Sequence, residues 1–193
     1  MASYPILPYR NKQFLHITNA LSTNDVERAV EEGLALNLKE SMVGISGSGV
    51  IDSTVRRSQT ATYEIKTHAW LYELIAKNVH RWNEEHFGYD IHGIERIQFA
   101  QYPADILGHY SAHVDTFPGT EIRKLSLSIQ LSNPEDYDGG VCELLFGGDK
   151  RIPLKSQRGA GLLFPSYFPH HVTPVTRGMR YSLVAWILGP QFR

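Results

Sequence analysis

The sequence predicts an α+β protein that is mainly β, in which about two helices flank a small antiparallel barrel or jelly roll. Two segments of the first half carry apolar residues at helical spacing, which indicates helices. After Gly93 the chain becomes a series of short apolar or alternating segments separated by Gly, Pro, Asn and Asp, which is typical of strands. The 193 residues, 42% of them apolar, are enough for one hydrophobic core. We expect a single domain, 1–193, with helical support and a flap over about 1–94 and the β core over about 95–193.

The two predicted helices lie before the β-rich half. From Ser22 the stretch STNDVERAVEEGLAL supplies polar capping residues, acidic residues in the first turns and apolar residues at helical spacing. A second helix is expected from about Thr67 to Phe87, with Trp70 and Trp82 in the core. Its apolar stripe is formed by Leu71, Leu74, Ile75, Val79 and Trp82, with Asn78 at the same spacing.

The segment from Met42 to Ser58 is rich in Gly and Ser, so we expect a loop near one end of the fold that acts as a flexible flap. Its run GISGSG lacks the Lys-Ser/Thr ending of a phosphate-binding loop. Arg56 and Arg57 lie at its end and are candidates for substrate contacts.

Five later segments predict the strands of the core: ERIQFAQY, KLSLSIQLS, GGVCELLF, GAGLLFPS and RYSLVAWIL. In KLSLSIQLS, apolar residues alternate with Ser126, Ser128 and Gln130, so one face is core and the other is polar. In a narrow barrel that polar face would line a pocket, whereas an ordinary solvent-facing side is the competing interpretation. Tyr102 at the end of ERIQFAQY could offer its hydroxyl to the same pocket.

The bulk composition restricts the partners and the compartment. Lys plus Arg total 19 and Asp plus Glu total 20, so no net field draws the chain to nucleic acid or to a membrane. The single cysteine, Cys142, excludes an internal disulfide, fits a reducing compartment and is expected in the core. The N-terminus shows no signal-peptide pattern and no run of about 18 apolar residues occurs. We therefore expect a soluble cytoplasmic protein; its oligomeric state is not indicated.

His113 and Asp115 form a His-x-Asp pair, the first part of a candidate metal site. On a strand, residues two apart project to the same face, so the imidazole and the carboxylate can converge on one ion. His170 and His171 are both candidates for the third ligand. Two histidines and one carboxylate leave metal positions open for a co-substrate and oxygen, which favours ferrous iron. A zinc site would need a fourth ligand or a bound water.

Arg180 begins the last predicted strand, ten residues after His170. Alternation places Arg180, Ser182, Val184 and Trp186 on one face and the apolar residues Tyr181, Leu183, Ala185 and Ile187 on the other. A guanidinium buried beside a ligand strand needs an anion, and the distal carboxylate of 2-oxoglutarate would supply one. A structural salt bridge is the alternative.

Between about Glu95 and Trp186 the sequence resembles the prolyl 4-hydroxylase-like branch of the Fe(II)- and 2-oxoglutarate-dependent oxygenases, which includes the small bacterial PKHD-type hydroxylases. Four blocks carry the resemblance: QFAQYPADILGHYSAHVD, LSLSIQLSNPEDYDGG, LLFPS and HHVTPVTRGMR, of which the last is the most specific. The resemblance implies a double-stranded β-helix core, jelly-roll or cupin-like, with the N-terminal helices flanking it. It implies a dioxygenase that uses Fe(II), O₂ and 2-oxoglutarate to hydroxylate an unactivated C–H bond and releases succinate, with ascorbate sustaining activity.

The resemblance also assigns residues. It selects His170 over His171, because the family's distal histidine stands four residues before the proline that here is Pro174. The roles that it implies for this chain are iron ligation by His113, Asp115 and His170, 2-oxoglutarate binding by Arg180 and Tyr102, and proximity to substrate for Trp186. The chain departs from animal prolyl hydroxylases at Gln130, where several of them place a tyrosine on the co-substrate. We expect Ser128 and Gln130 to contribute to the co-substrate pocket here.

Two other classes of protein remain as alternatives. A cupin-like metal-binding protein or isomerase shares the barrel, but usually has His-x-His and a following glutamate. A catalytically silent binding module on the same scaffold would not need an intact ligand set. Nucleic-acid demethylation is disfavoured by the near-neutral charge. We expect a peptide or small-molecule substrate, open between a peptidyl proline, a free amino acid and another metabolite.

Overall fold

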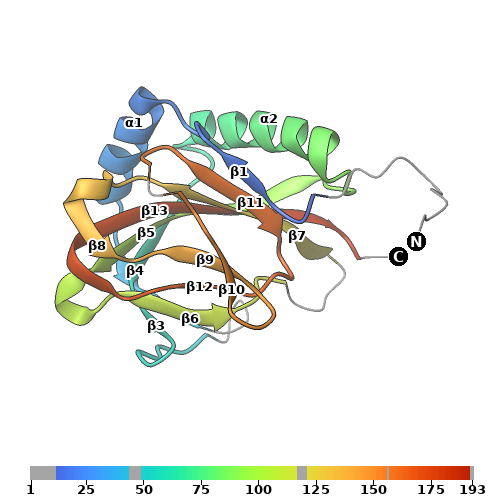
Figure 1. The fold of residues 1–193 in the computed structure, drawn as a ribbon. Helices are drawn as coiled ribbons and strands as arrows, with labels where there is room; N and C mark the ends of the chain where they lie inside the picture. Colours follow the sequence, from blue (N-terminus) through green and yellow to red (C-terminus); the bar gives the residue numbers. More distant parts are fainter. Residues whose placement is uncertain (1–11, 44–48, 117–120, 156, 192–193) are drawn as a thin grey trace.

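The computed structural model describes residues 12–43, 49–116, 121–155 and 157–191. Within these ranges the chain is mainly β, with two antiparallel sheets and two α-helices (Figure 1). The helices are α1 (Thr23–Leu34) and α2 (Ala69–His86), and the short 3₁₀ turns are η1 (Ala104–Ile106) and η2 (Pro134–Asp136). The strands are β1 (Leu15–Ile17), β2 (Lys39–Glu40), β3 (Arg56–Arg57), β4 (Gln59–Tyr63), β5 (Gly93–Pro103), β6 (His109–His113), β7 (Glu121–Gln130), β8 (Tyr137–Gly139), β9 (Cys142–Phe146), β10 (Lys150–Pro153), β11 (Gly161–Pro165), β12 (His170–Val172) and β13 (Val175–Pro190).

The larger sheet has the strand order β1-β11-β7-β13-β5-β4-β2, and β8 pairs with β13. In the middle of this sheet, Leu183 of β13 lies opposite Ile129 of β7 on one side and Phe99 of β5 on the other. These apolar residues and their neighbours two positions away project to the face that both helices cover (Figure 1). The main hydrophobic core therefore lies between the helices and the outer face of the larger sheet.

Helix α1 begins where a capping box satisfies its first backbone donors. The Ser22 side chain accepts a hydrogen bond from the Asp25 backbone N–H, and the Asp25 carboxylate accepts one from the Ser22 backbone. Gly33, in its last turn, allows close packing on the sheet, since a Cβ there would lie 2.5 Å from the Phe99 ring. The buried Tyr63 hydroxyl donates to the Ala29 carbonyl and ties α1 to β4.

The smaller sheet has the order β10-β9-β12-β6-β3 and faces the inner side of the larger sheet. A second buried cluster lies between them, containing Ala100 and Tyr102 of β5, Phe164 of β11 and Leu144 of β9. The inner side of the larger sheet also carries buried polar residues of β7 and β13. The space between the two sheets therefore has both apolar and polar residues along it.

The helices and strands agree with the sequence predictions in kind and differ at their ends. Helix α2 begins two residues later and ends one residue earlier than expected. Trp82 is buried as predicted, but Trp70 is only half-buried, with its ring beneath the Arg28 guanidinium at 4.1 Å. All five predicted segments contain strands, although GGVCELLF is divided between β8 and β9. The patterns do not predict β1–β4 or β10, which are two to five residues long.

The Met42–Ser58 segment is not a loop throughout, which corrects the expectation of a continuous loop; its action as a flap stays a prediction. Arg56 and Arg57 form β3, which pairs with β6, and Val43 bridges to Val50. Most of the run GISGSG, residues 44–48, lies outside the described residues. The arginines of this segment are therefore held at the edge of the smaller sheet.

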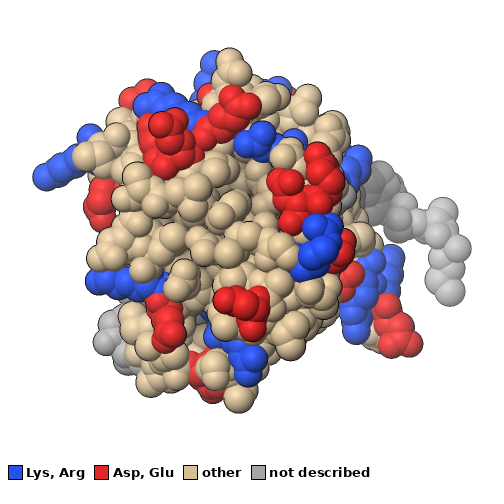
Figure 2. Space-filling model, turned by 90° about the vertical axis from the view of Figure 1, so that its left-hand side faces the viewer, with Lys and Arg blue, Asp and Glu red and all other residues tan. Residues whose placement is uncertain are grey.

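No helix in the described ranges has both the length and the apolar character needed to cross a membrane. On the face shown in Figure 2, acidic and basic side chains are interspersed around a largely uncharged centre. That face carries no continuous basic stripe of the kind that would follow a nucleic-acid backbone.

Candidate active site

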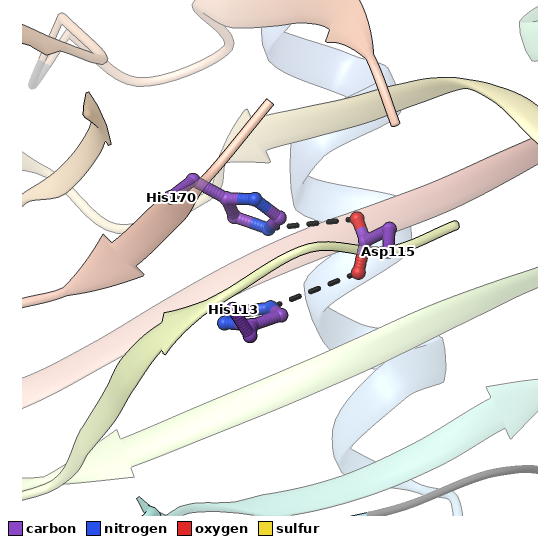
Figure 3. Close-up of side chains that lie close together, drawn as sticks. All are labelled: His113, Asp115 and His170. Carbon is purple, nitrogen blue, oxygen red and sulfur yellow. Dashed lines mark ion pairs between the residues drawn. The ribbon is translucent and has the colours of Figure 1, made fainter. Parts of the chain in front are cut away.

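Three side chains that could hold a metal ion meet between the two sheets (Figure 3). His113 ends β6, His170 begins β12, and the two residues are paired across these strands. Nε2 of His113 lies 3.7 Å from Oδ1 of Asp115, and Nε2 of His170 lies 3.5 Å from Oδ2. The three candidate ligand atoms all lie within 4.8 Å of one another. The structure thus brings together the His-x-Asp pair and the first histidine of the HH sequence.

Strand alternation does not determine the orientation of Asp115. Strand β6 ends at His113, so Asp115 lies two residues beyond it. Its backbone N–H donates to the Ser166 carbonyl at 2.9 Å, and its Oδ2 accepts from the Ser126 hydroxyl at 2.7 Å. The carboxylate is therefore oriented by contacts to β7 and to the residue after β11.

Both imidazoles present the same nitrogen to the cluster. Nδ1 of His113 lies 2.8 Å from the Ser111 carbonyl, and Nδ1 of His170 lies 3.1 Å from the Phe168 carbonyl. A carbonyl can only accept, so these contacts place the hydrogen on Nδ1 and leave the Nε2 lone pairs facing Asp115. Carbonyl partners of this kind orient metal-ligating histidines.

The surroundings of His113 and Asp115 favour a neutral imidazole beside an ionised carboxylate. Burial, with the charge of His170 next, lowers the pKa of His113 to about 3. For Asp115, burial raises the pKa, but the adjacent His170 and His113 and the Ser126 hydrogen bond lower it by more. These are the protonation states that metal ligation requires.

A buried guanidinium lies in the same pocket. Arg180 is 1% exposed, and its Nε donates to Oε1 of Gln130 at 3.1 Å. Its guanidinium carbon lies 5.4 Å from the centre of the Tyr102 ring. Nη1 of Arg180 is buried and has no hydrogen-bond partner among the residues that the structure describes. Since an unpaired buried cation is costly, this atom calls for an anion from outside the chain.

Most residues that the sequence predicts for the site line this one pocket. They are His113, Asp115, His170, Arg180, Tyr102, Ser128, Trp186 and Arg56. Gln130 contacts the pocket through Arg180, and its own amide nitrogen donates to the Ser132 carbonyl. The polar face of β7 is buried, so the solvent-facing alternative is wrong.

Two predicted neighbours of the site turn away from it. Arg57 donates to the backbone carbonyls of Ser53 and Ile106. His171 lies on the opposite side of β12 from His170 and pairs with Glu143, with Nε2 to Oε2 at 2.8 Å. Cys142, expected as a core residue, is buried and also lines the pocket.

Tyr110 and Ser166 are contacts that the sequence interpretation missed. The Tyr110 ring stacks on the His113 imidazole, with centroids 3.6 Å apart. These residues are three apart, and an irregularity in the β6–β12 pairing brings them together. Ser166 shares a hydrogen bond with Ser126 at 2.9 Å, and only its place in the LLFPS block could have indicated it.

Residues 97–188 match the sequence profile described as the 2OG-Fe(II) oxygenase superfamily. Through this region the sequence is similar to the 2OG-Fe(II) oxygenase superfamily. The match includes the three candidate ligands, Arg180, the strands β6–β12 and most of β5 and β13. It agrees with the resemblance that the sequence blocks carry.

Curated relatives match part of the sequence, and solved structures match the fold. A PKHD-type hydroxylase of Methylobacillus flagellatus is 41% identical over 87 residues, which are 40% of this chain and 37% of that protein. The match thus spans little more than a third of this relative. A Trichoplax adhaerens prolyl hydroxylase, solved with a peptide fragment of the oxygen degradation domain of hypoxia inducible factor, has a TM-score of 0.76 at 20% identity, over 92% of this chain and 84% of that chain. A Pseudomonas putida prolyl-4-hydroxylase has a TM-score of 0.74 at 18% identity, over 93% and 94%. At these identities the structural likeness establishes a shared fold.

Proposed function

We propose that this protein is an Fe(II)- and 2-oxoglutarate-dependent dioxygenase, prolyl 4-hydroxylase-like, that hydroxylates an unactivated C–H bond of a peptidyl or free amino acid. The observation that carries the proposal is one pocket in which two Nε2 atoms and a carboxylate converge beside a buried guanidinium with an unpaired Nη1. Three protein ligands leave room on the metal for co-substrate and oxygen. The family match supports the proposal and does not favour a cupin-like isomerase.

In this proposal His113, Asp115 and His170 hold the iron. Ferrous iron with 2-oxoglutarate and O₂ would supply the oxidising chemistry that puts one oxygen atom on the substrate and releases succinate and CO₂. The chain's own contribution is to orient the ligands. Nδ1 of each histidine is fixed by a carbonyl, and Ser126 fixes the carboxylate.

Arg180 binds the distal carboxylate of 2-oxoglutarate. Gln130 holds Nε of Arg180 in place, so that Nη1 is the free donor toward the pocket. Ser128 and Tyr102 line the same space and are the proposed hydrogen-bonding groups for the co-substrate. The apolar neighbours Val184, Leu127 and Phe164 exclude water around it.

The two facing antiparallel sheets are proposed to form a double-stranded β-helix, as the fold shared with prolyl hydroxylases supports. The site then lies between the sheets, where β6 and β12 present the two histidines, Asp115 follows the end of β6, and β13 presents Arg180. We treat the whole of 1–193 as one oxygenase domain.

The proposal is tested by supplying the metal-free protein with ferrous iron and 2-oxoglutarate under air. Succinate should form slowly without added substrate, and faster with candidate peptides and amino acids that gain one oxygen atom by mass. Cupin-type isomerisation would leave 2-oxoglutarate unchanged. Turnover that does not depend on iron, or no succinate with any candidate, contradicts the proposal.

A further inference from the structure

A groove of about 640 Å³ adjoins the metal pocket. Its lining includes Thr60 and Thr62 of β4, Gln98 of β5, and the residues Leu36 and Asn37. The volume lies within the range of about 300–1,000 Å³ that holds drug-sized ligands. Such a groove can hold a short peptide, with hydroxyl and amide side chains available to its backbone.

Arg56 and Gln98 line both this groove and the metal pocket, so the two cavities meet at these residues. The Arg56 guanidinium lies 4.4 Å from the centre of the Tyr110 ring, which in turn stacks on His113. A positive charge is thus held at the entrance to the candidate iron site.

Arg56 is bound only to neutral groups among the described residues. Its Nε donates to the Ser58 hydroxyl at 2.8 Å, and its Nη2 donates to Oε1 of Gln98 at 3.4 Å. Nearby arginines differ, because Arg123 pairs with both carboxylate oxygens of Glu95 at 2.6 and 2.8 Å. Arg96, which also lines the groove, lies 3.1 Å from the same carboxylate.

The other charges of the groove have both signs. Lys39 and Arg96 are basic, while Glu40 and Glu64 are exposed acidic residues. Two guanidiniums without a carboxylate partner in the described structure therefore face the metal pocket. One is Arg180 at its base, assigned above to 2-oxoglutarate, and the other is Arg56 at its mouth.

We propose that the substrate carries a carboxylate close to the carbon that is oxidised, and that Arg56 binds this carboxylate where the groove opens into the metal pocket. The inference rests on the proposed function and adds a substrate class to it. The carboxylate belongs either to an acidic residue of a peptide lying in the groove or to a free amino acid. A planar guanidinium suits a carboxylate because it donates two parallel hydrogen bonds.

The test measures binding in two arms, with ferrous iron and 2-oxoglutarate present under nitrogen. One arm presents a random hexapeptide library in which one position is fixed as Glu or as Gln. The other presents free glutamate, aspartate and proline against their amides. Wild-type protein should prefer the carboxylate by about 10- to 100-fold in at least one arm, as a charged hydrogen bond requires. The preferred arm identifies the source of the carboxylate.

Three variants assign the preference to its residue. Arg56→Gln should abolish it, and Arg56→Lys should retain part of it, because the charge remains without the planar fork. Arg57→Gln is the matched control and should keep it, since the Arg57 guanidinium faces backbone carbonyls. Melting temperatures confirm that each variant is folded.

Equal binding of acids and amides by the wild-type protein in both arms overturns the proposal. It is also overturned if Arg56→Gln keeps the preference, or if this variant loses 2-oxoglutarate binding as Arg180→Met does. Failure of the oxygenase proposal is separate, because it appears as missing succinate under air. A carboxylate preference measured under nitrogen does not depend on turnover.

Discussion

Replacing Arg180 by methionine separates the proposed co-substrate contact from the proposed metal site. Methionine retains much of the length of the side chain and removes the charge and all five N–H donors. The proposed metal ligands lie on β6, on β12 and beyond the end of β6, and none of them is hydrogen-bonded to Arg180 in the described structure. Iron should therefore still bind to the variant at one ion per chain.

The size of the effect follows from the burial of Arg180, which is 1% exposed. Removing one partner of a buried, hydrogen-bonded charge pair costs about 2–5 kcal/mol, so Kd for 2-oxoglutarate should rise about 30- to 5,000-fold. The ligand-free protein should respond differently. Losing a cation whose Nη1 is unpaired is favourable, whereas leaving Oε1 of Gln130 without its donor costs about 1–3 kcal/mol. These effects oppose each other, so the free energy of unfolding should change little.

The assay is calorimetric titration of 2-oxoglutarate into iron-loaded protein under nitrogen, beside urea unfolding of the ligand-free protein. Arg177→Met is the control, because Arg177 lies on the same strand and makes an exposed pair with Asp138. It should leave 2-oxoglutarate affinity unchanged. If Arg180→Met binds 2-oxoglutarate as tightly as the wild type, the pocket has been assigned to the wrong residue.

Three further predictions concern the metal site. His170→Ala should lose iron and succinate formation together, because it removes a proposed ligand. His171→Ala removes only the contact to Glu143 and should keep iron. Iron retained by His170→Ala and lost by His171→Ala would reverse the assignment. Zinc should inhibit by occupying the same donors and ascorbate should prolong turnover, so unchanged succinate formation at saturating zinc would count against the site. The metal-free protein should lose stability as the pH falls from about 7 toward 3, by up to about 1.4 kcal/mol per pH unit. The reason is that His113, with its pKa lowered to about 3, stays neutral in the folded protein over this range. In the unfolded chain the same imidazole takes a proton below about 6.5, so acid favours unfolding. His113→Gln should flatten that slope in urea unfolding measured at successive pH values, and an unchanged slope would show that another group causes it.

Local pattern was sufficient where an element is long and one of its faces is buried. The alternation in RYSLVAWIL places Tyr181, Leu183, Ala185 and Ile187 in the main core, while Arg180 and Trp186 face the pocket, as predicted. Helices α1 and α2 were predicted from apolar spacing and from the cap at Ser22. Strands such as β2 and β3 have only two residues, and their pairing with β4 and β6 comes from distant parts of the chain.

The candidate site also combines features that local pattern predicts with features that depend on distant parts of the chain. The residue types and the spacing of His113, Asp115, His170 and Arg180 were sufficient to predict side chains that the structure brings into one pocket. Their roles in binding a metal and a co-substrate stay a prediction. The side-chain contacts that orient Asp115 and Arg180 were not predictable, because they join segments far apart in the chain. Ser126 reaches Asp115 across 11 positions, and Gln130 reaches Arg180 across 50.

The sequence by itself determined which residues are candidates for the proposed chemistry, because ligand type, charge and alternation are properties of residues and their near neighbours. Only the tertiary structure decided which guanidiniums lack a carboxylate partner. Arg56 and Arg57 are adjacent and chemically identical, yet β3 turns one toward the metal pocket and the other toward backbone carbonyls. That difference arises from the pairing of β3 with β6, in which successive side chains project to opposite sides.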